Sequence, residues 1–252
     1  MPTGSYLLIG LFLPLFPLSM GFNFVLGKSR SAPLRILLLL LWPQIGLTLL
    51  PMLDSPVPGW IVPLALFSAA LYALRALALR DVGQWSGFLA TSAWALLWIV
   101  YQGGMPILQL HLFALGFSVP LVLLTLLGAG LERRFGAAYT GLYGGLAESL
   151  PRFSAILVLV VLAIIATPLF PTFFIMLATV MQAATLMPLV AVGIALVWLL
   201  WSWAGARLLQ GLIVGSPGDD EVIDLSRLTT GAYTLTLTLL VVSGLYGMGV
   251  LL

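Results

Sequence analysis

Long apolar runs, separated by short polar or proline-containing segments, make up most of the sequence. The runs are continuous, whereas the strands of a membrane barrel alternate between apolar and polar residues. A helix needs about 20 apolar residues to cross the hydrocarbon core of a bilayer, and its backbone polar groups must be satisfied internally. The pattern predicts an all-α, polytopic transmembrane helix bundle of about nine spans, forming a single transmembrane domain over residues 1–252. The predicted helices cover residues 5–27, 34–53, 59–79, 84–103, 106–131, 152–167, 170–185, 188–213 and 228–251.

One apolar run, LPRFSAILVLVVLAIIATPLFPTFF, is interrupted by two prolines. A proline inside a helix removes a hydrogen bond and clashes with the preceding turn. We therefore expect a broken helix near residues 167–171, with the break formed by Thr167, Pro168 and Pro171. We expect the freed backbone groups to be satisfied by neighbouring helices or by the hydroxyls of Thr167 and Thr172.

The distribution of Lys and Arg predicts the orientation in the bilayer, because short cytoplasmic loops carry an excess of basic residues. The first, third and fifth predicted loops have basic residues in them or at their edges: Lys28, Arg30, Arg35, Arg75, Arg80, Arg133, Arg134 and Arg152. This places the odd loops in the cytoplasm and the N-terminus outside. The acidic loop 214–227 then lies outside if segment 170–185 is a crossing of its own. It lies inside if that segment is re-entrant or is half of one broken helix.

The composition strengthens the assignment to a membrane. Of the 252 residues, 62% are hydrophobic and 7% are charged, whereas soluble domains carry about 25% charged residues. The absence of cysteine excludes disulfides, thiolate metal sites and cysteine nucleophiles. The net charge of +2 gives no electrostatic basis for nucleic-acid binding. We interpret residues 5–27 as a retained first helix rather than a signal peptide. We expect a multi-pass protein of the inner (cytoplasmic) cell membrane, in contact with the lipid bilayer. No fixed-period repeat is evident.

Few residues can handle protons within the predicted spans. His111 is the only histidine, and an ionisable group within a span is costly and often functional. The alternative is a histidine at the interface, hydrogen-bonded to Gln109 or to a neighbouring helix. Arg75 lies more than one turn deeper than Arg80, so it either lines a polar axis or extends its side chain to the cytoplasmic headgroups. The candidate proton path therefore consists of His111, Arg75 and Asp81.

The remaining charges have simpler interpretations. Arg207 follows two tryptophans near a helix end and is expected to anchor that end at the interface, or to pair with a carboxylate of another subunit. Glu132 and Glu148 flank a basic loop, where we expect a solvated cluster of little energetic value or a docking site for a partner protein. The sequence contains no Gly-rich phosphate loop, metal-ligand cluster or nucleophile–base pair. We therefore predict no enzymatic activity, no metal and no cofactor.

The order of motifs over residues 70–215 resembles a known family. The stretch ALYALRALALRDVGQWSGFLATSAWALL contains Asp81, followed by Gly83 and Gln84. Further on, Tyr-Gly-Gly-Leu-Ala precedes Pro151 and a long apolar helix. These features resemble the antiporter-like, proton-conducting membrane subunits of respiratory complex I and its relatives. In that family Asp-Leu-Lys-Arg-type residues form the first turn, and a Gly-Gly-Leu turn precedes the proline.

The resemblance describes a truncated and degenerate member. When the family's glycine is aligned with Gly128, Gly116 and Pro120 occupy the positions of its histidine and lysine, and His111 falls about one residue from its other histidine. The family also has an acid or lysine in the helix after the break, where this chain has apolar residues around Met176. Residues 1–55 form a helix pair that the resemblance does not place.

The resemblance implies a non-catalytic membrane subunit of a proton-coupled multi-subunit complex, bracing or completing a full-length antiporter-like subunit. The candidate complexes that the resemblance suggests are respiratory, hydrogenase, cation-antiporter and inorganic-carbon uptake complexes. A second hypothesis is a proton-conducting subunit that uses His111 and Arg75. A third is an independent small-molecule transporter, but transporters often carry paired broken helices in corresponding halves, and the sequence does not predict such a pair.

Overall fold

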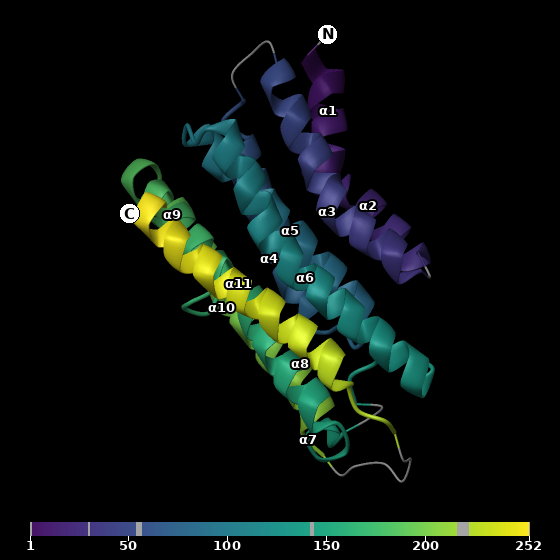
Figure 1. Ribbon diagram of the computed structural model, residues 1–252. Helices are drawn as coiled ribbons and strands as arrows, with labels where there is room; N and C mark the ends of the chain where they lie inside the picture. Colours follow the sequence, from purple (N-terminus) through teal and green to yellow (C-terminus); the bar gives the residue numbers. More distant parts are fainter. Residues whose placement is uncertain (1, 30, 54–56, 142–143, 216–221, 252) are drawn as a thin grey trace.

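The computed structural model describes residues 2–29, 31–53, 57–141, 144–215 and 222–251 (Figure 1). Every regular element within these residues is a helix, which confirms the all-α class. The α-helices are α1 (Pro2–Phe12), α2 (Ser19–Lys28), α3 (Ala32–Leu49), α4 (Ile61–Ala76), α5 (Val82–Gln102), α6 (Ile107–Phe135), α7 (Leu146–Ser149), α8 (Pro151–Ile164), α9 (Pro171–Leu186), α10 (Pro188–Ile213) and α11 (Arg227–Leu251); a 3₁₀ helix, η1 (Leu50–Met52), follows α3.

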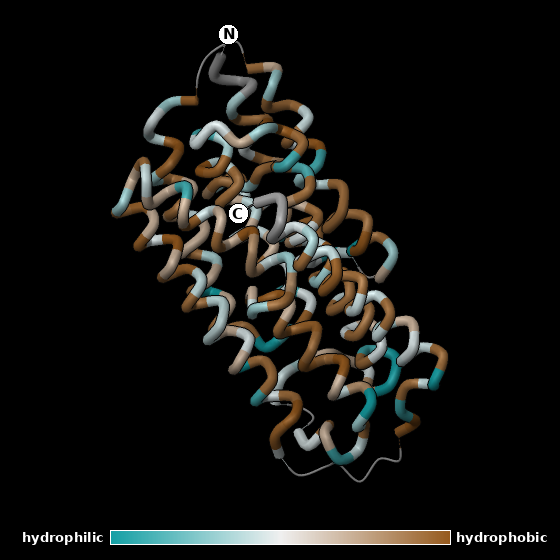
Figure 2. Tube along the Cα trace, turned by 60° about the vertical axis from the view of Figure 1, so that its left-hand side comes forward, coloured by the Kyte–Doolittle hydropathy of each residue, from teal (hydrophilic) through white to brown (hydrophobic). Residues whose placement is uncertain are grey.

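The long helices run side by side along one axis of the molecule, with α1–α3 on one side and α8–α11 on the other (Figure 1). Between them, α5 packs against α4 and α6, while α3 packs against α6 and α10 packs against α4. Apolar residues cover most of the length of the bundle, and hydrophilic residues gather toward one end (Figure 2). All residues of α5 from Leu89 to Val100 are buried, so α5 forms the centre of the bundle.

Four helical segments among the described residues are long and apolar enough to cross a membrane. They are Ala32–Met52, which includes η1, and Ile107–Phe135, Pro188–Ile213 and Arg227–Gly247. The protein is therefore a multi-pass membrane protein. The nine predicted spans are not confirmed, because α4, α8 and α9 contain only 16, 14 and 16 residues.

The prediction of a single first helix over residues 5–27 is wrong, because the chain is broken between α1 and α2. The intervening residues 13–18 contain Pro14 and Pro17. Two prolines three positions apart cannot continue a helix without losing hydrogen bonds to the preceding turn. The tetrapeptide Pro-Leu-Phe-Pro that begins at Pro14 recurs at residues 168–171. The chain therefore contains a short repeat that the sequence analysis missed.

The second copy of this tetrapeptide lies between α8 and α9. α8 ends at Ile164 and α9 begins at Pro171. α8 leads away from one end of the bundle, and α9 continues in the same direction toward the other end (Figure 1). The geometry therefore agrees with two halves of one broken helix.

The described part of the loop 214–227 lies beside the connection between α6 and α8. Arg134 Nε donates to the carbonyl of Ile223 at 3.0 Å, and the Arg152 backbone N–H donates to Asp224 Oδ2 at 2.8 Å. Of the two predicted placements of this loop, these contacts agree with the one in which segment 170–185 is half of one broken helix, so that the loop lies at the same end as the connection between α6 and α8. The acidic residues at 219–221 lie outside the described residues.

Candidate functional site

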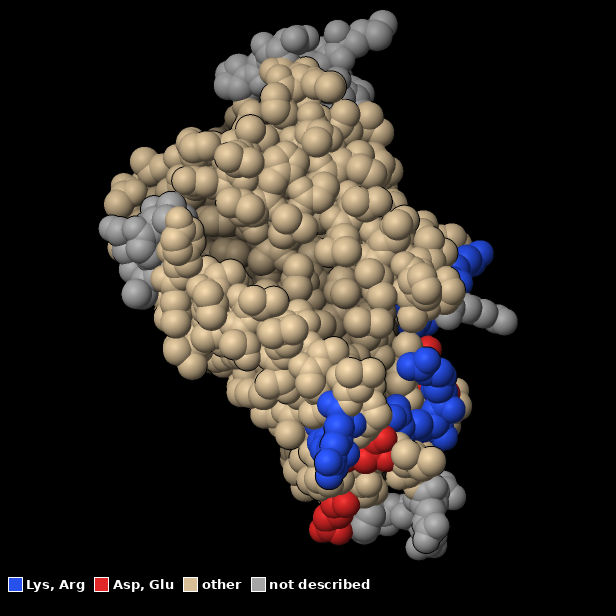
Figure 3. Space-filling view, viewed as in Figure 1, with Lys and Arg blue, Asp and Glu red and all other residues tan. Residues whose placement is uncertain are grey.

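The charged residues of the described chain gather at one end of the molecule, here named the charged end (Figure 3). At this end α2, α4, α6 and α10 finish, and α3, α5, α8 and α11 begin. The residues are Lys28, Arg35, Arg75, Arg80, Asp81, Glu132, Arg133, Arg134, Glu148, Arg152, Arg207, Asp224 and Arg227. All formally charged side chains of the described residues therefore lie at one end of the bundle.

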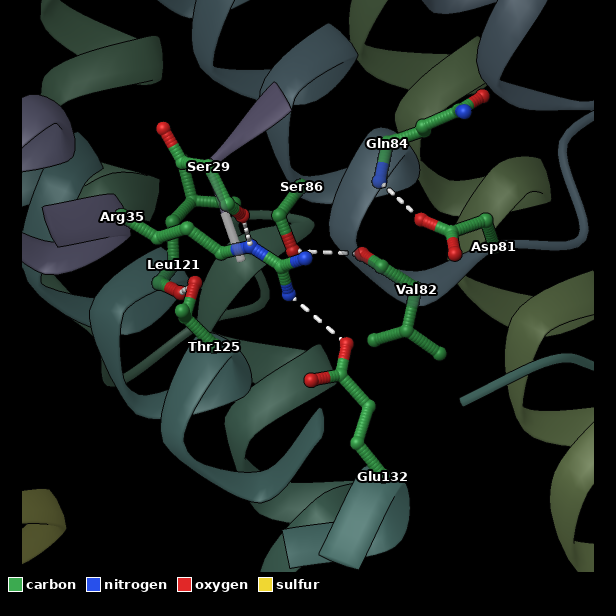
Figure 4. Close-up of polar contacts among 9 residues, drawn as sticks. All are labelled: Ser29, Arg35, Asp81, Val82, Gln84, Ser86, Leu121, Thr125 and Glu132. Atoms are coloured by element: carbon green, nitrogen blue, oxygen red, sulfur yellow. Dashed lines mark hydrogen bonds and ion pairs between the residues drawn. The ribbon is translucent and has the colours of Figure 1, made fainter. Parts of the chain in front are cut away.

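Asp81 directly precedes α5 at the charged end (Figure 4). Its Oδ1 accepts the backbone N–H of Gln84 at 2.6 Å, so it caps the first turn of the helix. The neighbouring residue Val82 donates its N–H to the carbonyl of Ala138 at 3.0 Å. Asp81 thus has a structural partner in its own helix, and it lines a polar cavity of about 280 Å³ with Arg35 and Glu132.

The same cavity contains an ion pair that the sequence analysis did not identify. Arg35 of α3 donates from Nη1 to Glu132 Oε1 of α6 at 2.8 Å (Figure 4), with exposed fractions of 17% and 33%. Arg35 Nε also donates to the carbonyl of Ser29 at 2.7 Å. Glu132 is therefore more than a member of a solvated cluster, because it holds the start of α3 against the end of α6.

Arg75 does not line a polar axis inside the bundle. Its side chain is exposed, and its guanidinium carbon lies 5.2 Å from the centre of the Phe88 ring. This distance is typical of a cation–π contact. The neighbouring residues Tyr72 and Ala76 form the buried side of α4, so Arg75 points away from the core.

His111 lies near the start of α6, at the opposite end of the bundle. Its Nδ1 is 2.5 Å from Oε1 of Gln44 in α3, and Gln44 Nε2 donates to the carbonyl of His111 at 3.2 Å. The two residues therefore join α3 to α6, as in the interpretation of a histidine bonded to a neighbouring helix. Gln44 was not singled out from the sequence, although a lone amide in an apolar helix is a signal that could have identified it.

The structure does not bring the three candidate proton-path residues together. His111 and Glu132 are 21 positions apart on α6, which is about 32 Å of helix, and Asp81 and Arg75 belong to the charged end. Between these ends the described buried polar side chains are neutral, and most of them are hydrogen-bonded; the exceptions are Trp85 Nε1, Ser154 Oγ and Gln182 Oε1. Examples of the hydrogen-bonded pairs are Ser19 with Tyr72 at 2.8 Å, Asn23 with Thr91 at 2.9 Å and Ser92 with Trp201 at 2.8 Å.

Side chains donate to four carbonyl groups at the break between α8 and α9. Thr167 Oγ1 donates to Leu162 at 2.9 Å and Thr172 Oγ1 to Ala163 at 2.5 Å. Trp198 of α10 donates from Nε1 to the carbonyls of Ile165 at 3.1 Å and Ala166 at 3.2 Å. The sequence indicated the two threonines but not Trp198, which is 32 positions away from the nearer carbonyl.

Apolar packing fills the positions at which the resemblance places charged residues. A β-carbon added at Gly116 would overlap the Cδ1 of Ile175, and Met176 is fully buried. Ile175 thus occupies the space that a side chain at position 116 would need. A nearby cavity of about 370 Å³ between α6, α9 and α11 has a lining that is almost entirely apolar.

Comparisons with known proteins support the fold. No protein-family model and no curated protein sequence matches the chain. A chain of respiratory complex I from Thermus thermophilus matches with a TM-score of 0.84 and 23% identity, covering 97% of this chain and 54% of that chain. A chain of the Mrp complex from a Dietzia species matches with a TM-score of 0.78 and 15% identity, covering 96% and 55%. A chain of the membrane-bound sulfane sulfur reductase, an archaeal respiratory membrane complex, matches with a TM-score of 0.82 and 16% identity, covering 96% and 52%.

The chain shares the fold of these membrane-complex subunits. It spans about half the length of the chains that it matches. The likeness in fold extends beyond residues 70–215, because it covers 97% of the chain in the Thermus comparison. The shared fold therefore includes the first helices, which the sequence resemblance could not place.

Proposed function

We propose that the chain is a non-catalytic membrane subunit of a proton-coupled multi-subunit complex, located in the inner membrane. In this complex it would brace or complete a full-length antiporter-like subunit. The shared fold with chains of respiratory complex I and of another respiratory membrane complex supports the proposal.

The single observation that carries the proposal is the separation of the ionisable groups. About 32 Å of α6 lies between His111 and Glu132, and the described interior between them holds no Asp, Glu, Lys, Arg or His. Proton relays in membranes depend on such groups. Most of the described hydroxyls between these ends are already hydrogen-bonded, either within their own helix or to a neighbouring helix.

We further infer eight membrane crossings in place of nine. In this count α1 with α2 and α8 with α9 are each one broken crossing, and α3, α4, α5, α6, α10 and α11 are one each. The contacts of Arg134 with Ile223 and of Arg152 with Asp224 support it, because they bring the start of α11 to the end of the bundle where α8 begins. With this count the basic connections lie on the cytoplasmic side.

The structure contains two broken helices, whereas the sequence predicted one. The structure therefore supports the transporter hypothesis more than the sequence alone does. Substrate sites of transporters are formed where broken helices expose backbone groups to a cavity. At both breaks, however, tryptophan side chains already donate to backbone carbonyls. We therefore retain the subunit hypothesis ahead of the transporter, and ahead of a proton-conducting subunit that uses His111 and Arg75.

Proton flux tests the proposal directly. Liposomes that contain only this chain should show the same dye-reported proton flux under a pH gradient as empty liposomes. Flux above that background, removed by His111→Ala in a correctly folded variant, would establish the proton-conducting alternative.

Purification tests the partner. The tagged chain, extracted from its own host in mild detergent, should co-purify with a longer antiporter-like subunit in a fixed ratio. Recovery of the chain alone, folded and without any membrane partner, would contradict the bracing role while leaving the flux result valid.

A further inference from the structure

A groove runs along α11 beside the first turn of α8, at the charged end. Its volume is about 680 Å³. Arg152 and Arg227 line it together with the face of α11 between Thr230 and Thr238. We call this the α8–α11 groove. It combines two cations with the side of a helix that is apolar enough to cross a membrane.

The two arginines are not neutralised within the described chain. Both are exposed, and the only ion pair found among the described residues is the one between Arg35 and Glu132. Asp224 is close, but its carboxylate accepts the backbone N–H groups of Arg152 at 2.8 Å, Phe153 at 3.1 Å and Leu225 at 2.7 Å. That carboxylate therefore satisfies the start of α8, and the guanidinium groups can bind another anion.

The wall of the groove along α11 suits hydrocarbon although it contains threonines. Thr234 Oγ1 donates to the carbonyl of Thr230 and Thr238 Oγ1 to that of Thr234, both at 2.9 Å. Because these hydroxyls are bonded within the helix, they need no polar partner in the groove. Leu235 and Gly231 complete this face.

We propose that the α8–α11 groove binds an anionic phospholipid, with its phosphate on Arg152 and Arg227 and an acyl chain along α11. Basic pockets between helices on the cytoplasmic side suit anionic headgroups, and the guanidinium group matches phosphate oxygens in geometry. Free phosphate would use only the arginines. A groove that continues for two turns along a helix apolar enough to cross a membrane favours the lipid, and the proposal is independent of whether the chain conducts protons.

The test uses the full chain in mild detergent, titrated separately with phosphatidylglycerol, phosphatidylcholine of the same acyl chains and inorganic phosphate. Native mass spectrometry should show retained phosphatidylglycerol, and this lipid alone should raise the unfolding temperature. Removing one arginine as R152Q or R227Q should weaken phosphatidylglycerol binding about fivefold, and the double variant about thirtyfold, because each basic residue near the bilayer surface contributes a similar increment.

Two matched controls separate the groove from general charge and from general packing. The variant R133Q/R207Q removes the same charge from exposed arginines outside the groove and should leave lipid binding unchanged. Gly231→Leu should block the groove, since a β-carbon at Gly231 meets nothing within 4 Å. Gly247→Leu on the same helix also has open space at the β-carbon and should have no effect on lipid binding.

Three results would overturn the proposal. Equal affinity of the wild type and R152Q/R227Q for phosphatidylglycerol would exclude the arginines. Equal stabilisation by inorganic phosphate would indicate an anion site without a lipid. Loss of a co-purifying subunit in the double variant, with no retained lipid in the wild type, would assign the groove to a partner helix.

Discussion

The two breaks in the helices share the tetrapeptide Pro-Leu-Phe-Pro, but they satisfy their backbones in different ways. In the first, between α1 and α2, the partners come from other helices. Trp42 of α3 donates to the carbonyl of Leu11 and Trp98 of α5 to that of Leu13, both at 3.0 Å. The N–H of Phe16 donates to Ser68 Oγ of α4 at 2.9 Å.

The second break relies partly on its own sequence. Thr167 lies within it and Thr172 follows it, and both donate to carbonyls at the end of α8. Only Trp198 comes from another helix. The comparison shows that the same four residues end a helix in either setting, while the neighbours decide how the freed groups are satisfied. The first break depends on tertiary structure more than the second.

Each break also contacts a glycine of a neighbouring helix. A β-carbon at Gly46 of α3 would lie 2.9 Å from the nitrogen of Leu13 and 3.0 Å from the carbonyl carbon of Phe12. At Gly244 of α11 it would lie 2.8 Å from the oxygen of Leu169 and 2.9 Å from the nitrogen of Pro171. Both breaks therefore require a position without a side chain opposite them.

The largest effect is expected from substituting these glycines. Gly46→Ala and Gly244→Ala should each lower the free energy of unfolding by about 2–3 kcal/mol, because the added carbon forces the backbone apart. Unfolding in mixed detergent micelles, followed by circular dichroism, measures this difference. Gly27→Ala is the control, since nothing lies within 4 Å of its β-carbon. An unchanged stability of Gly46→Ala would show that the first break moves freely.

A smaller effect should distinguish the two sets of tryptophan donors. Trp98 is fully buried, whereas Trp198 is half-buried. Trp98→Phe should cost about 1–2 kcal/mol, because the carbonyl of Leu13 loses its donor away from water, and Trp198→Phe about 1 kcal/mol. The same unfolding measurement compares them. Equal losses would mean that the two breaks depend equally on tertiary contacts.

The smallest effect is expected at the hydroxyl groups. Thr172→Val and Ser68→Ala should each cost about 1 kcal/mol, the typical net value of one hydrogen bond. Thr167→Val should cost less, because Thr167 is half-buried while Thr172 is buried. Hydrogen exchange at α8 and α9 would report the local opening. Faster exchange in Thr167→Val than in Thr172→Val would contradict this order.

The comparison also explains what could be read from the sequence. The second break is recognisable because threonines stand beside its prolines. The first lies among leucines and phenylalanines, and its partners Trp42, Trp98 and Ser68 are 31, 85 and 52 positions away from the groups that they bind. Local sequence carries no signal for partners so distant. A search for short repeats would have found the first break through Pro14 and Pro17.

Hydropathy predicted α10 to the residue, as 188–213, and most of the other long helices closely. For the candidate site it supplied residue types without their positions in space. His111, Arg75 and Asp81 were grouped because their side chains are ionisable. In the structure, the length of α6 separates His111 from Arg75 and Asp81. The pair of Arg35 and Glu132 joins residues 97 positions apart, so only the tertiary structure reveals it.

The burial of α5 has a consequence for how the protein is made. This helix has 21 residues, enough to cross the bilayer, yet it is not among the four segments that are apolar enough to do so. The residues from Leu89 to Val100 are buried beneath other helices, so this part of α5 does not contact lipid and does not need a strongly apolar surface. A segment of this kind moves only weakly from the translocation channel into the lipid by itself. We expect it to leave the channel together with α4 and α6, which pack against it, so that the insertion of these three helices is cooperative.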